Sequence, residues 1–270
     1  RRRSQPVGTT RSSPRPKRVQ FAMASSASGK EEERGPRAGS LYGDMMRGIR
    51  SGHSRGNTIR MLKLPLVLTE EALYAEAIAQ FYLLTLRLEK MLERHKGNDL
   101  VDRVRSLGLR VTPGYKKDLK ELMGPSWMTK AVSAATPATM DYCAELEAMD
   151  AEETVAASFI LYGALVVGGG KSTQAKVRKI FPKCKHALFD VGEDMKALRA
   201  DFKSCFDGIG HAYPELREKL VSEATRFMAL NNTVILSIKC WGTYATYASL
   251  AAAALALAAL LTWKRSLLPF

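Results

Sequence analysis

The chain has 270 residues, 46% of them hydrophobic, which is enough to bury one sizeable core in a single main domain. Its formal net charge of +14 would favour nucleic acid or an anionic membrane as a partner if the charge were evenly spread. The first thirty residues, however, carry eight Lys or Arg and no acid. This leader contains Phe21 as its single aromatic residue, so it lacks a stacking platform for bases, and a nucleic-acid partner is not expected.

Residues 1–40 are interpreted as a basic leader without stable structure. The Arg/Ser-rich, acid-free composition resembles an organelle transit sequence and is equally compatible with a disordered basic tail. The chain begins with Arg1 and its first Met is Met23, which is consistent with a fragment, a processed form or a mis-assigned start.

The four cysteines argue against a zinc site and against a disulfide scaffold. They show no C-x-x-C spacing and no cluster with histidine, so small buried thiols in a reducing, cytosol-facing domain are expected. They are Cys143, Cys184, Cys205 and Cys240.

Helical periodicity begins after Pro65. Thr69 can cap the next helix, whose apolar residues recur at intervals of three and four through His95. Further helices are expected over about 115–122, after Pro137, from about Ala151, over 190–206 and after Pro214. No window alternates with period two, so the sequence predicts an all-α, multi-helix bundle of seven or eight helices over residues 41–239.

The C-terminal segment predicts a membrane anchor. Residues 240–263 form a run of 24 positions without a charged residue, and roughly 20 are needed to cross a bilayer core as a helix. Tryptophan and tyrosine lie near its ends, and Lys264 and Arg265 follow it. We therefore expect a C-terminal transmembrane helix with a short tail at 264–270, while a buried hairpin helix is the alternative.

Three consecutive glycines interrupt the helical stretch "YGALVVGGGKSTQ", Tyr162 to Gln174. Gly170-Lys171-Ser172 matches the end of a phosphate-binding loop, but Leu165 occupies a position where that motif needs glycine, and no strand precedes it. A helix break without function is a second interpretation. The third is a helix that bends where its bare backbone packs against a flat ligand.

Several segments, in this order, resemble the haem (heme) oxygenase family. They are "MGPSW", "TPATMDYCAEL", "YGALVVGGGK" and "PELREKLVSEATRFMALN", and the resemblance covers about Met46 to Leu236. The C-terminal apolar run is similar to that of the membrane-bound members. The resemblance implies haem as both substrate and prosthetic group, and its oxidative cleavage to biliverdin, carbon monoxide and ferrous iron. It also implies dioxygen and an external electron donor, either an NADPH-dependent reductase or a ferredoxin, as partners.

The resemblance assigns the iron ligand and the facing wall of a haem pocket. His53 matches the family's haem-ligating histidine, and a neutral imidazole suits that role because it offers a lone pair to iron. Gly168 and Gly169 match the distal glycines. Tyr162 matches the aromatic residue before them, and Phe159 falls at the family's distal tyrosine.

The resemblance also suggests groups for the haem edge. Arg199 and Lys203 lie four residues apart, so they share a helix face and could each meet a propionate. A solvated charged face is the alternative. Phe227 matches the family's aromatic residue at the haem edge, and a purely core role is equally compatible with it.

The chain departs from the family at a distal carboxylate. The family has an aspartate three residues before the first matched glycine, where it orders the water used for proton delivery, and counting back from Gly168 gives Leu165. No carboxylate occurs between Ala156 and Gly170. Leucine cannot order water or relay a proton, which puts turnover in doubt and leaves haem binding intact. A haem-binding protein without turnover and a structural membrane protein of the same fold are therefore the alternatives.

The membrane of the endoplasmic reticulum is the expected location, and a plastid or mitochondrion is the alternative. A tail anchor favours the endoplasmic reticulum with the domain facing the cytosol, whereas the acid-free leader favours a plastid or mitochondrion.

Overall fold

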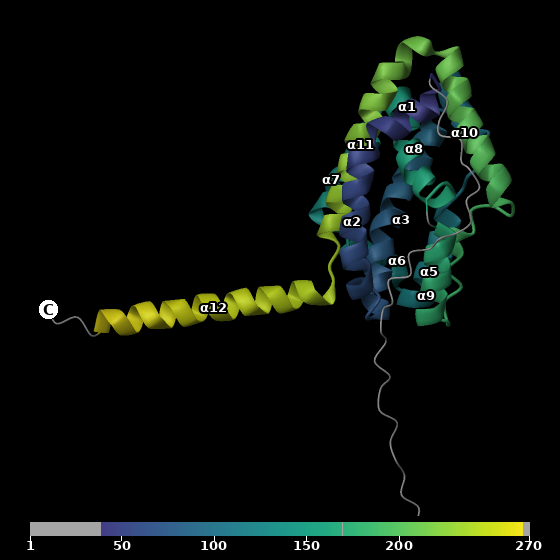
Figure 1. Cartoon of the computed structure of the whole chain (residues 1–270). Helices are drawn as coiled ribbons and strands as arrows, with labels where there is room; N and C mark the ends of the chain where they lie inside the picture. Colours follow the sequence, from purple (N-terminus) through teal and green to yellow (C-terminus); the bar gives the residue numbers. More distant parts are fainter. Residues whose placement is uncertain (1–38, 169, 267–270) are drawn as a thin grey trace, which may run out of the picture. The chain divides into compact units, whose positions relative to one another are not determined.

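The structure is a computed structural model that describes residues 39–168 and 170–266. Within these residues the chain forms twelve α-helices and two short 3-10 helices, η1 (Ala187–Phe189) and η2 (Pro214–Leu216), and no strand (Figure 1). This confirms the all-α prediction. The number of helices exceeds the seven or eight expected, because hydrophobic periodicity does not reveal short helices such as α4 and α6. The α-helices are α1 (Leu41–Gly48), α2 (Arg50–Val67), α3 (Glu71–Arg94), α4 (Asp99–Arg105), α5 (Thr112–Met123), α6 (Trp127–Ser133), α7 (Pro137–Ala148), α8 (Ala151–Val166), α9 (Gly170–Ile180), α10 (Met195–Ala212), α11 (Arg217–Ser237) and α12 (Trp241–Ser266).

Helix α3 forms one side of the core and packs against α5, α7 and α8. Its buried positions include the periodic residues Leu73, Ala77, Leu84, Leu88 and Met91, as the sequence pattern requires. The prediction for Thr69 is wrong in detail. Its hydroxyl donates to the carbonyl of Leu66 at 2.7 Å, so it caps the end of α2, and the N-cap position of α3 is Glu70.

Helix α8 is buried on almost all sides between α3, α4 and α11. It begins with a capping box, in which the Asp150 carboxylate accepts from the N–H of Glu153 and the Glu153 side chain accepts from the N–H of Asp150. It ends in a bend, where the N–H groups of Val167 and Gly168 both donate to the carbonyl of Gly163, at 2.9 and 3.0 Å. The acidic start and apolar continuation of this segment therefore produce the core helix that the sequence predicts.

Helix α2 lies beside α11 (Figure 1). Two glycines of α2, together with the last residue of α1, face α11 closely. Gly48, Gly52 and Gly56 recur every four residues, so they lie on one side of the chain. A Cβ atom on them would lie 2.8 Å from Val221, 2.9 Å from Met228 and 2.1 Å from the Oδ1 of Asn232, respectively. The Nδ2 of Asn232 donates to the carbonyl of Gly52 at 2.8 Å, which links the two helices where they are closest.

The membrane anchor stays a prediction. Among the described residues no single helix is both long and apolar enough to span a bilayer, and a shorter apolar helical stretch covers Ser249–Leu260. Helices α8 and α9, taken together as a bent pair, are long and apolar enough to span a bilayer by length and composition alone. Most of α8, however, is buried in the protein core. The expectations for the leader over 1–38, for Gly169 and for 267–270 fall outside the described residues.

We predict that Gly56→Ala destabilises the fold by about 1–3 kcal/mol, because the new methyl group would displace Asn232 and break its bond to Gly52. Gly208→Ala is the matched control, because a Cβ there meets nothing within 4 Å and alanine favours the interior of α10 by up to about 1 kcal/mol. Thermal and urea unfolding measure both changes. Equal effects of the two substitutions would contradict the close packing of α2 on α11.

Candidate functional site

A cavity of about 300 Å³ lies between α1, α2, α8, α10 and α11. Its walls are mainly apolar, with contributions from Ile49, Phe159, Phe202, Met228 and Ile235. The lining residues with polar side-chain groups are Tyr42, His53, Asn57, Arg60, Asn231 and Asn232. A concave, mainly apolar cavity with a few polar groups is typical of a small-molecule or cofactor site, and its volume is at the lower end of the range for such sites.

His53 lies on the face of α2 that forms one wall of this cavity. Its backbone N–H donates to the carbonyl of Ile49 at 2.7 Å, and its imidazole is exposed. Ile49, Asn57 and Arg60 follow the same face at helical spacing, and all three line the cavity. The structure therefore brings the histidine singled out in the sequence to the cavity.

The bend at the end of α8 forms the facing wall, through Gly163, Ala164, Val167 and Gly168. A Cβ atom on Gly168 would lie 2.5 Å from the carbonyl oxygen of Ala164, a clash with backbone that cannot relax. A Cβ on Gly163 would make only an ordinary contact with Phe202, at 3.7 Å. Gly168 is therefore required by the bend itself, whereas Gly163 keeps space open in the cavity.

In the structure, a carboxylate at Leu165 would not lie in the cavity wall, whereas one at Ala164 would. Leu165 does not line the cavity, whereas Ala164, one position and roughly 100° around the helix from it, and Val167 do. Counting back from Gly168 thus selected a residue outside the lining. Ala164 is apolar as well, and no Asp or Glu is among the lining residues.

The two cations singled out in the sequence lie outside the lining. The Nε of Arg199 donates to the carbonyl of Val166 at 2.9 Å, so this guanidinium caps the C-terminus of α8. The ammonium group of Lys203 lies 5.7 Å from the ring centroid of Tyr42. The lining cation is Arg60, whose Nη2 donates to the Oδ1 of Asn57 at 2.8 Å. The sequence signal that could have identified Arg60 is its position seven residues after His53, because two helical turns place both side chains on the same face of α2.

Of the three aromatic residues singled out, only Phe159 lines the cavity. It packs edge-on against Phe206, with ring centroids 4.9 Å apart. Tyr162 is buried in the core, and its hydroxyl has no hydrogen-bond partner among the described residues. Phe227 is also in the core, stacked on Tyr142 with ring centroids 5.9 Å apart. The residue after it, Met228, lines the cavity instead, because one position turns a helical side chain by roughly 100°.

This donor set fits a flat, apolar, iron-containing group with acidic edges. The His53 imidazole has no hydrogen-bond partner described by the structure, so its lone pair is available to a metal. Arg60 can pair with a carboxylate, and Gly163 leaves room for close approach of a planar ligand. The Oδ1 of Asn232 is buried without a described hydrogen-bond partner, as expected beside a cavity that holds a ligand or water.

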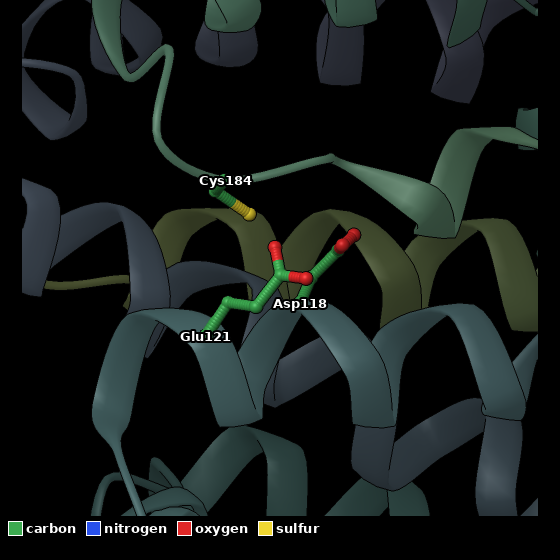
Figure 2. Close-up of side chains that lie close together, drawn as sticks. All are labelled: Asp118, Glu121 and Cys184. Atoms are coloured by element: carbon green, nitrogen blue, oxygen red, sulfur yellow. The ribbon is translucent and has the colours of Figure 1, made fainter.

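A second cluster, Asp118, Glu121 and Cys184, has the donor atoms of a metal site, all within 4.8 Å of one another (Figure 2). The two oxygens of Asp118 accept from the N–H groups of Ala187 and Leu188, at 2.7 and 2.8 Å. Glu121 accepts from the N–H of Lys185 at 2.9 Å. Burial raises the pKa of the Cys184 thiol to about 12, which keeps it protonated. The carboxylates of the cluster therefore hold the segment 184–188, which follows α9, against α5. They already accept hydrogen bonds from its backbone, and the thiol is protonated.

Three thiols are expected to react slowly with iodoacetamide at neutral pH. Burial raises the pKa values of Cys143 and Cys205 to about 11 and that of Cys184 to about 12, so little of the nucleophilic thiolate is present. We predict rates at least about a hundredfold below that of an unperturbed cysteine, recovered in denaturant. Peptide mapping by mass spectrometry measures each thiol, and a site alkylated as fast as an unperturbed cysteine would contradict its burial.

Comparison with known proteins agrees with this geometry. The family model for heme oxygenase matches residues 45–237. The crystal structure of heme oxygenase 2 from Chlamydomonas reinhardtii without heme aligns with a TM-score of 0.69 and 28% identity, covering 74% of this chain and 98% of that one. Heme oxygenase-1 from the cyanobacterium Synechocystis sp. PCC6803, in complex with heme, aligns with a TM-score of 0.67 and 17% identity, covering 79% and 97%.

The heme oxygenase from Leptospira interrogans has the same fold, with a TM-score of 0.62 and 17% identity, covering 73% of this chain and 98% of that one. Curated protein sequences include no match. Because the family model covers more than half of the residues, and because the fold agrees with these structures over most of their length, the chain belongs to the haem oxygenase family.

Proposed function

We propose that this chain binds haem in the cavity between α2 and α8, with His53 as the axial ligand, and cleaves it to biliverdin, carbon monoxide and ferrous iron. The observation that carries this proposal is that His53 and the glycine bend of α8 line the same cavity. Membership of the haem oxygenase family supports the reaction class. Dioxygen and electrons from an NADPH-dependent reductase or a ferredoxin are the co-reactants that this chemistry requires.

Each lining group has a distinct task in this proposal. Haem supplies the iron centre at which dioxygen chemistry takes place. His53 would hold the iron, and Arg60 would pair with a propionate. Phe159 and Met228 would help to exclude water from the cavity, Gly163 would leave room for a ligand beside α8, and Gly168 would keep the bend that forms this wall.

One specific observation favours a second candidate, a haem-binding protein without turnover. No Asp or Glu lines the cavity, and the amides of Asn57, Asn231 and Asn232 can orient water but cannot release a proton at neutral pH. Haem would then be held by the same residues, without efficient proton delivery. A structural protein that retains the fold would bind no haem, so a binding measurement separates it from both candidates.

We also propose that α12 anchors the chain in a membrane, of the endoplasmic reticulum or alternatively of a plastid or mitochondrion. The uncharged run over 240–263 supports this proposal. So does the exposure of the side chains described within α12, which include all those from Ser249 to Leu260. A helix that is apolar all round is stable only when something apolar covers it.

We predict that the chain mixed with haemin gives a Soret band that His53→Ala abolishes or shifts, because the iron loses its protein ligand. His211→Ala is the matched control, since His211 is also exposed on a helix but lies outside the cavity lining. Titration followed by absorbance gives both affinities. An unchanged spectrum in His53→Ala would contradict the assignment of the ligand.

We predict that Ala164→Asp raises the yield of biliverdin under air and reductant, by about a hundredfold if proton delivery limits the wild type. Leu165→Asp is the matched control, one residue away and outside the lining. Growth of the biliverdin absorption band measures both variants. A larger gain from Leu165→Asp would contradict the orientation of α8. A high yield in the wild type would instead show that the amides and ordered water suffice.

A further inference from the structure

The second half of α2 combines positive charge with exposed apolar side chains. Helix α2 carries Arg50, Arg55, Arg60 and Lys63 and has no acidic residue. Leu62 is 70% exposed, the highest exposure of the large hydrophobic residues described outside α12. Met61 is 57%, Leu66 39% and, on α11, Leu236 49% exposed. A small domain gains nothing from exposing several large apolar residues together unless a partner covers them.

Some of these residues share the side of α2 that faces away from the cavity, whereas Arg60 lines the cavity. Leu62 follows His53 by nine residues, which places it roughly 180° around the helix from the cavity wall. Arg55 and Leu66 are seven residues before and four after Leu62, so they share its side. The ammonium group of Lys63 donates to the carbonyl of Leu236, which joins the end of α11 to the same region. We name Arg55, Leu62, Leu66 and Leu236 the α2 outer surface.

The chain connectivity ties the α2 outer surface to the anchor. Helix α11 ends at Ser237 and α12 begins at Trp241. Five residues separate Leu236 from Trp241, and an extended chain spans at most about 3.6 Å per residue. Whatever the direction of α12, its first turn therefore lies within about 18 Å of Leu236. An anchor that begins there would hold the α2 outer surface beside the membrane.

From these observations we infer that the α2 outer surface is a membrane contact that binds anionic lipid, an inference that rests on the proposed anchoring by α12. A cationic side chain beside large apolar ones, here Arg55 beside Leu62 and Leu66, is typical of a surface that lies in the lipid interface. A soluble acidic partner would account for Arg55 but would leave Leu62 and Leu66 without a role. The contact fixes the orientation of the domain, with the His53 face turned away from the lipid and toward soluble partners.

The test uses the full chain in phosphatidylcholine vesicles, with and without phosphatidylserine. A photo-crosslinking amino acid, p-benzoylphenylalanine, replaces Leu62, whose exposure tolerates the larger side chain. The control places it at Ala212, an exposed residue beyond the other end of α11, about 30 Å away along that helix. Flotation reports anchoring, and mass spectrometry reports lipid adducts.

We expect lipid adducts at position 62 and not at 212, with a yield that rises with phosphatidylserine. Arg55→Gln is expected to lower the yield at position 62 by roughly fivefold in phosphatidylserine vesicles and to leave it unchanged in phosphatidylcholine. Chains that float but give no more adduct at 62 than at 212 would overturn the contact and leave the anchor in place. Yields independent of phosphatidylserine would overturn the preference for anionic lipid, and chains that do not float would overturn both the contact and the anchor.

Discussion

The absence of Cβ atoms between α2 and α11 is the constraint on which the candidate site depends. Gly52 and Gly56 let the two helices approach until the Asn232 amide donates to the carbonyl of Gly52. That bond is made to the residue directly before His53, so the packing of α2 also sets the direction of the imidazole. A larger residue at any of these glycines would push α2 outward and move the histidine with it.

The facing wall depends on glycine for a different reason. At Gly168 the obstacle to a side chain is the carbonyl of Ala164 in the same chain segment, so the bend of α8 requires glycine whether or not a ligand is present. Arg199 then satisfies the carbonyl of Val166 at this bend. A mostly exposed helix held close to its neighbour, α2, and a buried, bent helix, α8, thus form facing walls of the cavity.

The polar groups of the cavity include no carboxylate. They belong to one histidine, one arginine, three asparagines and one tyrosine, Tyr42. Such a lining can hold a metal-containing acidic ligand and can orient water around it. Because no carboxylate is present to relay protons, the binding of such a ligand and a reaction that consumes protons make different demands on this cavity.

The longer helices and the need for bare backbone near Gly168 could be predicted from the sequence, because helical periodicity and glycine are local signals, whereas His53 was singled out only through the family resemblance. Phe159 could also be placed, since its position relative to the glycines is fixed within one helix. Only the tertiary structure decided that Ala164 rather than Leu165, and Met228 rather than Phe227, line the cavity. The physical reason is that one residue turns a helical side chain by roughly 100°, so the choice depends on how each helix is rotated against its neighbours, which the chain's own pattern does not specify.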